Sequence, residues 1–354
     1  MGAVRPRRSG GPARLADVAA LAGVSVATAS QALNGGAVAP GTRVRVREAA
    51  TALRYVPRVS AQSLRTGRTT DIGLRILTTP ESLAYREATF FYALIRGAMA
   101  GGDEAGLHLS VQFVTTTPLD AGTRLAAEAA ARGFGAVIVL PQWANDTSYL
   151  AGLRAQGTPV VALNDAGAPA DCVLTVDEAH GVTLALDHLV ELGHRSVGYL
   201  AGPPGHLDAE ARLSAFYRLC AERGLRLDPG HVLRSDYAIS AGRHAFARYL
   251  RGDTRDMPTG WLAADDYIAA GALQAAHDAG LRVPEHFSLI GYDDIEIAQA
   301  TIPPLTSVHL PMYELGHGAV SAAAMLVDQD APPPAPHRSL RPTLTKRASV
   351  GRHA

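Results

Sequence analysis

The chain has 354 residues, of which 47% are hydrophobic, and its 33 basic and 33 acidic side chains give a formal net charge of zero. This length predicts two or three domains with a sizeable core. Two cysteines are too few for a disulfide framework, and we find no secretory leader and no run of about 18 apolar residues, so we expect a cytoplasmic protein that is neither exported nor inserted in a membrane.

The zero net charge conceals an asymmetry between the two ends of the chain. Residues 1–68 carry eleven arginines against two acidic residues, which gives +9, and the remainder carries 22 basic and 31 acidic residues, which gives −9. A basic segment on an acidic body predicts that one end binds a polyanion. Arginine pairs bidentately with guanine edges and phosphates, which favours nucleic acid, and a solvated charge run is the alternative.

Within this basic segment, residues 15–55 have the pattern of a helix-turn-helix unit. Leu15 to Ala22 has the apolar spacing of a short helix, and a glycine-containing turn follows. Ser25 can cap a second helix from Val26 to about Leu33, because its hydroxyl can accept a backbone N–H two or three residues on. An Asn-Gly-Gly run ends that helix, and Thr42 would cap a third helix ending near Leu53. The alternative is some other small three-helix unit.

A short segment between the headpiece and the rest of the chain can form a stable helix only when it is bound to a partner. Ser60 to Leu64 gives about one and a half helical turns, too short to be stable alone in water. DNA binding would order it and leave Leu64 as an apolar wedge that unstacks a base step in the minor groove. A flexible linker with an incidental leucine is the alternative.

From Thr70 onward, short apolar runs alternate with longer amphipathic ones. The expected strands are Ile72–Leu77, Leu107–Val114, Ala136–Leu140, Val160–Leu163, Val173–Val176, Ser196–Ala201, Trp261–Ala264, Phe287–Gly291 and a last strand near Ser339–Thr345. The expected helices include Leu94–Ala105, Thr123–Arg132, His180–Leu192, Ala209–Arg223, Gly242–Arg251 and Ile268–Ala279, and residues 347–354 read as a loose tail. This alternation predicts parallel sheets covered by helices, and the length predicts two lobes.

Polar residues follow several of the expected strands. Asn164 is one, and pairs of aspartates begin at Asp265 and at Asp293. Because ligands bind beyond the carboxyl ends of strands in open α/β sheets, we expect a polar cleft between the lobes. For each carboxylate the alternative is a helix N-cap, and Asp266 is the one that we expect to be a cap.

Four separated motifs, in order, carry a family resemblance. They are DVAALAGVSVATASQALNG (residues 17–35), SAQSL (60–64), LGHRSVGYLAGP (192–203) and VPEHFSLIGYDDIEIAQATIPPLTSV (283–308). Through them the chain resembles the LacI-type bacterial transcription regulators over about residues 14–345. The resemblance implies a homodimer and an all-α helix-turn-helix headpiece. It also implies a two-lobed α/β core, similar to a periplasmic sugar-binding protein, in which the chain crosses three times between the lobes.

The domain boundaries expected on this basis are a helix-turn-helix domain at 13–57, a hinge helix at 58–68 and an effector-binding and dimerisation core at 69–346. Lobe 1 would comprise about 69–164 and 295–325, and lobe 2 about 165–294 and 326–346.

For the DNA contacts, the resemblance places Val26, Ala27 and Gln31 where the family's recognition helix reads major-groove bases. Gln31 stands where the family usually has arginine, and glutamine pairs bidentately with adenine whereas arginine prefers guanine. Val26 and Ala27 offer only apolar contact, for instance to a thymine methyl. Ser25 and Thr28 would contact phosphates.

At the hinge, the resemblance places Leu64 at the operator centre, beside Ala61, whose small side chain lets two hinge helices approach each other. Effector binding would disorder these helices and lower DNA affinity. If the effector is a corepressor, the sign of the response reverses.

The effector contacts implied by the resemblance are Phe90, Phe91, Asn164, Arg212, Tyr237, Asp265 and Asp293. Arg212 would bind sugar hydroxyls or a ligand carboxylate, and Tyr237 would stack on the ligand ring. An arginine, carboxylates and aromatic rings suit a polyhydroxylated ligand. Asp265 stands where the family more commonly has an amide or a serine, so the expected ligand could instead carry an amine.

The function expected is therefore a transcription regulator, most simply a repressor, whose operator affinity is controlled by a sugar-like effector. Its expected partners are operator DNA, the effector and a second copy of the chain, without a membrane. A solute-binding protein is the alternative, but it leaves the +9 headpiece unexplained. An enzyme is not expected, because the sequence has no nucleophile elbow, P-loop or HExxH motif. No cofactor is expected, and the scattered histidines lack metal-ligand spacing.

Overall fold

The computed structural model describes residues 15–33, 37–53, 71–78, 87–115, 118–143, 148–328 and 330–353. It divides into two units, residues 1–68 and 69–354, and each is described by itself. The expected hinge helix, with Ala61 and Leu64, lies outside the described residues. In the described part of the chain, no single helix is long and apolar enough to cross a membrane.

Residues 15–33 and 37–53, the described part of the first unit, form the helices α1 (Leu15–Ala22), α2 (Val26–Leu33) and α3 (Pro40–Ala52). α1 and α2 meet at 99° across the turn, within the range of helix-turn-helix pairs. Val18, Ala29 and Val46, one from each helix, are fully buried together. The cap expected at Thr42 is wrong, because α3 begins at Pro40, a residue suited to the first helical turn.

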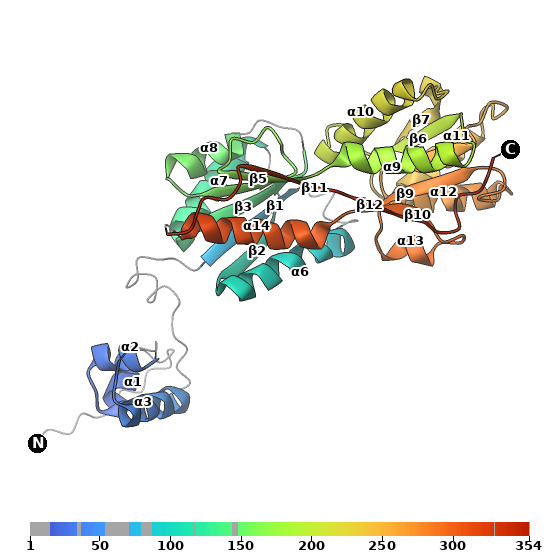
Figure 1. The fold of residues 1–354 in the computed structure, drawn as a ribbon. Helices are drawn as coiled ribbons and strands as arrows, with labels where there is room; N and C mark the ends of the chain where they lie inside the picture. The colour runs from blue at the N-terminus through green and yellow to red at the C-terminus, as the bar shows by residue number, and fades with distance from the viewer. Residues whose placement is uncertain are drawn as a thin grey trace, which may run out of the picture. The chain divides into compact units, whose positions relative to one another are not determined.

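The described residues of the second unit form two six-stranded sheets, one for each lobe (Figure 1). Lobe 1 has the strand order β11-β5-β4-β3-β1-β2, and all its pairs are parallel. Its strands are β1 (Asp71–Thr78), β2 (His108–Thr115), β3 (Ala136–Pro141), β4 (Val160–Leu163), β5 (Cys172–Val176) and β11 (His337–Leu340).

Lobe 2 has the order β12-β10-β9-β8-β6-β7 and is parallel except where β12 joins β10. Its strands are β6 (Val197–Ala201), β7 (Val232–Arg234), β8 (Gly260–Ala263), β9 (Ser288–Asp293), β10 (Thr306–His309) and β12 (Thr343–Thr345). The expected alternation of strands and helices is thus confirmed, and it forms one parallel sheet and one sheet that is parallel except at β12, both of ordinary size.

Helices cover both faces of each sheet. Lobe 1 carries α6 (Glu87–Ala105), α7 (Pro118–Arg132), α8 (Ser148–Ala155) and α14 (Met312–Val327). Lobe 2 carries α9 (Glu178–Glu191), α10 (Leu207–Glu222), α11 (Ile239–Leu250), α12 (Asp266–Asp278), α13 (Glu296–Ala300) and the 3₁₀ turn η1 (Pro229–His231).

Strand β3 shows why these strands are apolar throughout. Ile138 packs in the cluster that contains residues of α6 and α14, whereas Val137 and Val139 pack in the cluster that contains residues of α7 and α8. Successive side chains point to opposite faces, so burial of both faces requires a continuous apolar run. Figure 1 shows the two helix pairs on opposite faces of the lobe 1 sheet.

Helices α6 and α14 cross at glycines, which lets their backbones touch. A Cβ at Gly97 would lie 1.9 Å from the carbonyl oxygen of Tyr313, and one at Gly316 would lie 2.0 Å from that of Leu94. Only glycine fits at both positions, so this helix pair is closely packed.

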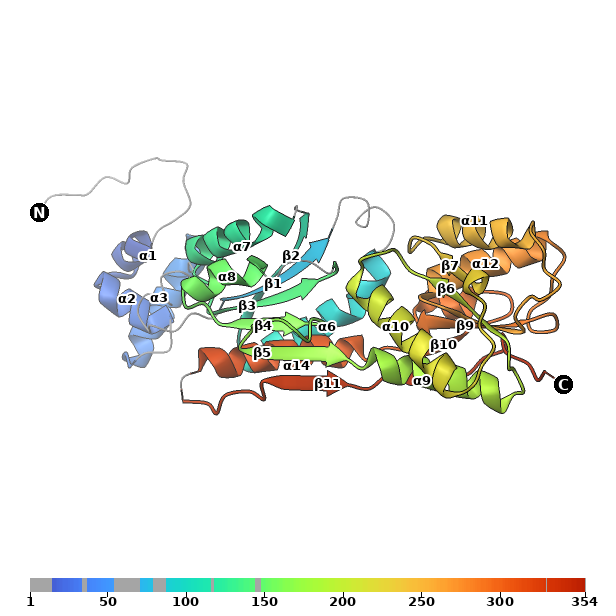
Figure 2. The ribbon, with the colours of Figure 1, turned by 90° about the horizontal axis from the view of Figure 1, so that it is seen from above.

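The expected lobe boundaries at 164 and 295 are wrong. The chain returns to the lobe 1 sheet through β5 after the polar loop at 164–171, and α13 and β10 belong to lobe 2. Figure 2 shows α14 and β11 on lobe 1, although both follow most of lobe 2 in sequence. The single last strand expected near 339–345 is instead two strands, one in each sheet. The crossings therefore lie at 176–178, 309–312 and 340–343.

The expectation of a loose C-terminal tail is also wrong. The side chain of Ser349 is fully buried, and its Oγ accepts a hydrogen bond from the backbone N–H of Thr306 at 2.8 Å. Further on, the N–H of His353 donates to the carbonyl of Leu192 at the end of α9. Residues 347–353 are therefore part of lobe 2.

Candidate functional site: a recognition helix and an interlobe pocket

Ser25 caps α2 as the sequence predicts. Its Oγ accepts the backbone N–H of Thr28 at 3.0 Å, and the two hydroxyls lie 2.8 Å apart. This cap satisfies one of the N–H groups that a helix leaves unpaired at its start. Contact of Ser25 and Thr28 with phosphates stays a prediction.

The rest of α2 divides into a buried face and an exposed face. Ala29 and Ala32 are fully buried in the headpiece, whereas Val26, Ala27 and Gln31 are exposed. The side chain of Val26 is 49% exposed, so it is available for an apolar contact outside the headpiece. The structure therefore presents the three predicted base-reading residues on the outside of one helix.

A pocket of about 500 Å³, here called the interlobe pocket, lies at the first crossing between the lobes. From lobe 1 it is lined by the loop after β4, the end of β5 and part of β11, and from lobe 2 by the first turns of α9 and α10. Asn164 is the one predicted effector residue that lines it. The amide oxygen of Asn164 accepts the N–H of Val176 at 3.0 Å, which fixes the side chain.

Arg212 and Asp293 meet, as the expectation of a shared cleft requires. Arg212 on α10 is 1% exposed, and its Nη1 donates to Asp293 Oδ1 at 3.2 Å and to the carbonyl oxygen of Ala264 at 2.6 Å. Its guanidinium carbon lies 4.0 Å from the ring centre of Tyr292. Burial lowers the pKa of Arg212, but Glu178 and then Asp293 more than offset this, so its pKa is raised and it stays charged.

Glu178 is the residue that sequence reasoning missed. It lines the interlobe pocket from the first turn of α9, and both its oxygens accept from Arg212, Oε2 from Nε at 2.7 Å and Oε1 from Nη2 at 3.1 Å. This is the bidentate geometry of strong arginine–carboxylate pairs. The signal in the sequence was its place directly after Asp177, the N-cap of α9, at the end of a strand.

Of the two aspartates after β8, the structure makes Asp265 and not Asp266 the helix cap. Asp265 is the N-cap of α12, with its Oδ1 accepting the N–H of Ile268 at 2.7 Å, so the cap expected at Asp266 is wrong. Asp266 instead accepts from the hydroxyl of Ser307 at 2.6 Å and from the N–H of Ile295 at 2.9 Å. Burial, and then the charge of Asp293, raise the pKa of Asp266 well above its ordinary value. A ligand contact by Asp265 stays a prediction.

The predicted aromatic contacts are buried. Phe90 and Phe91 lie in the apolar core, where the ring of Phe91 meets that of Phe113 edge-on at 5.6 Å. Tyr237 is 4% exposed and packs against Gly202 and the ring of His206. None of these three predicted residues lines the interlobe pocket, and their contact with a ligand stays a prediction.

A second link between the lobes, which the sequence did not reveal, lies beside this pocket. The N–H of Leu207, a lining residue, donates to the carbonyl of Gln142 at 2.9 Å, and Trp143 forms a β-bridge with His206. The rings of Trp143 and His206 meet edge-on at 5.3 Å. This contact joins the end of β3 to the start of α10.

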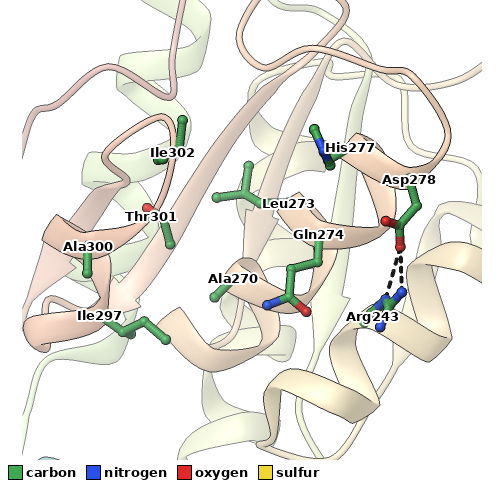
Figure 3. Close-up of a pocket in the computed structure, with 10 residues that line it drawn as sticks. All are labelled: Arg243, Ala270, Leu273, Gln274, His277, Asp278, Ile297, Ala300, Thr301 and Ile302. Carbon is green, nitrogen blue, oxygen red and sulfur yellow. Dashed lines mark hydrogen bonds and ion pairs between the residues drawn. The ribbon is translucent and has the colours of Figure 1, made fainter.

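Another pocket, of about 580 Å³, lies on lobe 2 between α12 and α13 (Figure 3). Ile302 on its rim is 93% exposed, and Arg243 pairs with Asp278 at its other side. None of the predicted effector residues lines this pocket, so the interlobe pocket is the better candidate for the effector.

Comparisons with known proteins identify both units. Residues 14–58 match the family model for bacterial regulatory proteins of the lacI family, and residues 186–350 match that for a periplasmic binding protein-like domain. The HTH-type transcriptional repressor PurR of Haemophilus influenzae (strain PittEE) is 30% identical over 87% of this chain and 89% of that protein. The HTH-type transcriptional regulator GalR of Escherichia coli (strain K12) is 31% identical over 96% of each chain.

Among solved structures, a Lac repressor dimer bound to operator and the anti-inducer ONPF matches with a TM-score of 0.84 and 26% identity. The match covers 96% of this chain and 100% of that one. The relatives compared are transcriptional regulators and not enzymes. The chain therefore belongs to the lacI family of bacterial regulatory proteins and is a transcriptional repressor with a DNA-binding headpiece and an effector-binding core.

Proposed function

We propose that this repressor binds a two-fold symmetric operator as a homodimer, with α2 of each headpiece in the major groove. The observation that carries the proposal is the exposed face of α2, which presents Val26, Ala27 and Gln31, whereas the alanines on the other face of this helix are buried. Exposed apolar side chains on a small basic unit suit thymine methyl groups, and a glutamine suits adenine. The related Lac repressor binds its operator as a dimer, which supports this assembly.

The effector of this repressor is a sugar-like molecule held in the interlobe pocket. A volume of about 500 Å³ falls within the range of small-molecule sites, and oxygen acceptors from both lobes line it. The related CelR was solved as a complex with cellobiose, a sugar, at 26% identity to this chain and a TM-score of 0.70.

Control of DNA binding follows from the position of this pocket at a crossing. A ligand that contacts Asn164 in lobe 1 and Asp208 in lobe 2 has a different affinity for each lobe arrangement, and only such a difference shifts an equilibrium. The coupling is reciprocal, so operator DNA must weaken an inducer by the factor by which the inducer weakens operator binding.

Gln31 gives the direct test of the DNA-reading part. Duplexes selected by the native protein from a randomised pool should share a palindrome, and Gln31→Arg should change one base pair in each half-site from A·T to G·C. One good bidentate pair discriminates by about 1–3 kcal/mol, enough to redirect the selection. Leu21→Arg, which adds the same charge at a position on α1 that is 57% exposed, is the control and should leave the sequence unchanged. An unchanged preference in Gln31→Arg would remove Gln31 from the base-reading surface.

A further inference from the structure

The interlobe pocket is acidic. Four carboxylates are among its lining residues, those of Asp165, Asp177, Glu178 and Asp208, whereas no lysine or arginine is among the residues that line it in the described chain. One of the four, Asp177, accepts the N–H of His180 as the cap of α9. The charged side chains that line this pocket are therefore all carboxylates, which accept hydrogen bonds and repel anions.

The arginine expected to bind an anionic ligand group is already occupied. Both oxygens of Glu178 take one side of the Arg212 guanidinium, while Asp293 and the carbonyl of Ala264 take Nη1. Four hydrogen bonds thus use four of the five N–H groups of this side chain. Two carboxylates more than neutralise its single positive charge.

Glu178 also stands at the boundary between Arg212 and the pocket. Glu178 lines the pocket, whereas Arg212 does not, although Ala211, which precedes Arg212 in the chain, is a lining residue. An anion could reach the guanidinium only if the bidentate carboxylate withdrew. Withdrawing one partner from a buried ion pair is strongly unfavourable. An anion that entered the pocket would also lose its hydration next to the negative charges of the lining carboxylates, and both effects are unfavourable.

We propose that the effector is an uncharged or cationic molecule rich in O–H or N–H donors, such as a free sugar or an amino sugar, and that Glu178 excludes phosphorylated and carboxylated analogues. This inference rests on the proposed function, because it names the ligand class of the same interlobe site. Arg212 then acts as a positioning residue that holds the Glu178 carboxylate at the pocket wall.

Inorganic phosphate is a probe that needs no knowledge of the effector. The chain has two tryptophans, of which Trp261 is fully buried in lobe 2 and Trp143 lies beside the pocket, next to the contact of Gln142 with Leu207. Tryptophan fluorescence therefore reports on the core, and phosphate bound to headpiece arginines leaves it unchanged. The native protein should show no saturable response to phosphate.

Glu178→Gln should gain such a response, because it removes one negative charge and frees guanidinium N–H groups for the anion. We expect phosphate binding at least about tenfold tighter than in the native protein, since bidentate charge-assisted contacts are strong. Glu191→Gln is the matched control, because Glu191 lies on the same helix with its side chain 68% exposed. Asp293→Asn is a second variant that removes one negative charge and weakens only one Nη1 hydrogen bond, since Nη1 also donates to the carbonyl of Ala264, so it should show a smaller gain.

The phosphate titrations of the native protein and the three variants decide the role of Glu178. Saturable phosphate binding by the native protein overturns the proposal. Folded Glu178→Gln and Asp293→Asn proteins that both fail to bind phosphate overturn the assigned role of Glu178. A gain in Glu191→Gln equal to that in Glu178→Gln does the same.

A second arm compares matched ligands on the native protein, glucose, glucosamine and glucose 6-phosphate, and likewise ribose and ribose 5-phosphate. Tighter binding of a phosphorylated member than of its free sugar overturns the ligand class but leaves the repressor intact. Operator binding is measured in the same samples, so a failure of the proposed function, seen as loss of specific DNA binding, is distinguished from a failure of this inference.

Discussion

Replacing Ser349 by alanine tests whether the C-terminal segment is an integral part of lobe 2. The Ser349 side chain is fully buried, and its Oγ accepts from Thr306 N at 2.8 Å and donates to the carbonyl oxygen of Leu289 at 2.5 Å. The same residue also pairs through its backbone, because its carbonyl accepts the N–H of Leu289. The hydroxyl thus joins β9 and β10 at a point that water does not reach.

The cost follows from the two backbone groups that lose their partner. A buried N–H left unpaired costs about 1–3 kcal/mol, and a carbonyl, with its second lone pair, costs less. We therefore expect Ser349→Ala to lower the free energy of unfolding by about 2–3 kcal/mol. For a core of this size the midpoint of thermal unfolding should fall by roughly 3–5 °C.

Urea unfolding measured by tryptophan fluorescence gives the free energy directly, and the midpoint should fall without a change in slope. Arg352→Ala is the control, because Arg352 is exposed in the same segment. This substitution should change the free energy of unfolding by no more than about 0.5 kcal/mol. If Ser349→Ala is as stable as Arg352→Ala, the reasoning about buried hydrogen bonds in this segment is refuted.

The remaining predictions concern charges and a cap. Burial, and then Asp293, raise the pKa of Asp266, so the folded protein holds this proton more tightly than the unfolded chain. The tighter binding of this proton stabilises the folded protein fully at pH values below 3.8, the ordinary pKa of aspartate, and this stabilisation is lost as pH rises through the folded pKa. The stability of Asp266→Asn relative to the native protein should therefore increase with pH. Urea midpoints across pH check this, and a gain that shrinks with rising pH would contradict it. Arg212→Met should cost about 3–5 kcal/mol, because it strands two buried carboxylates, and adding Glu178→Gln should recover part of the loss. If the double variant unfolds at lower urea than Arg212→Met, the ion pair is misassigned. Ser25→Ala should cost the headpiece about 1 kcal/mol, seen by circular dichroism, whereas unchanged stability would exclude the cap.

The headpiece could be predicted closely because its signals are local. A glycine turn, a serine cap and buried alanines at helical spacing fix α1 and α2 without help from distant residues. The core strands were predictable for a similar reason, since burial on both faces requires continuous apolar runs. Strands β7 and β10 were not among those expected. The last two strands were expected as one, because nothing in residues 337–345 says that one strand serves each lobe.

The site was only partly predictable because its pairing is tertiary. Arg212 and Asp293 are 81 residues apart, and their contact followed from the family resemblance. The sequence places Glu178 directly after an N-cap at the end of a strand, but its bidentate pairing with Arg212, 34 residues away, is a tertiary contact that this local signal does not reveal. The roles of Asp265 and Asp266 depend on which of two adjacent carboxylates turns toward the helix end, and the backbone after β8 decides that.

We propose that the headpiece reads DNA under the control of a ligand between the lobes. The most direct test is a titration of the full chain against a selected duplex and a scrambled one, at two salt concentrations and with the sugar panel. We expect saturable binding to the selected duplex, with a log–log salt slope of about −0.9 for each phosphate contact, and a change in affinity when one uncharged or amino sugar is added. Equal affinity for both duplexes, unaffected by any sugar that binds the core, would contradict it.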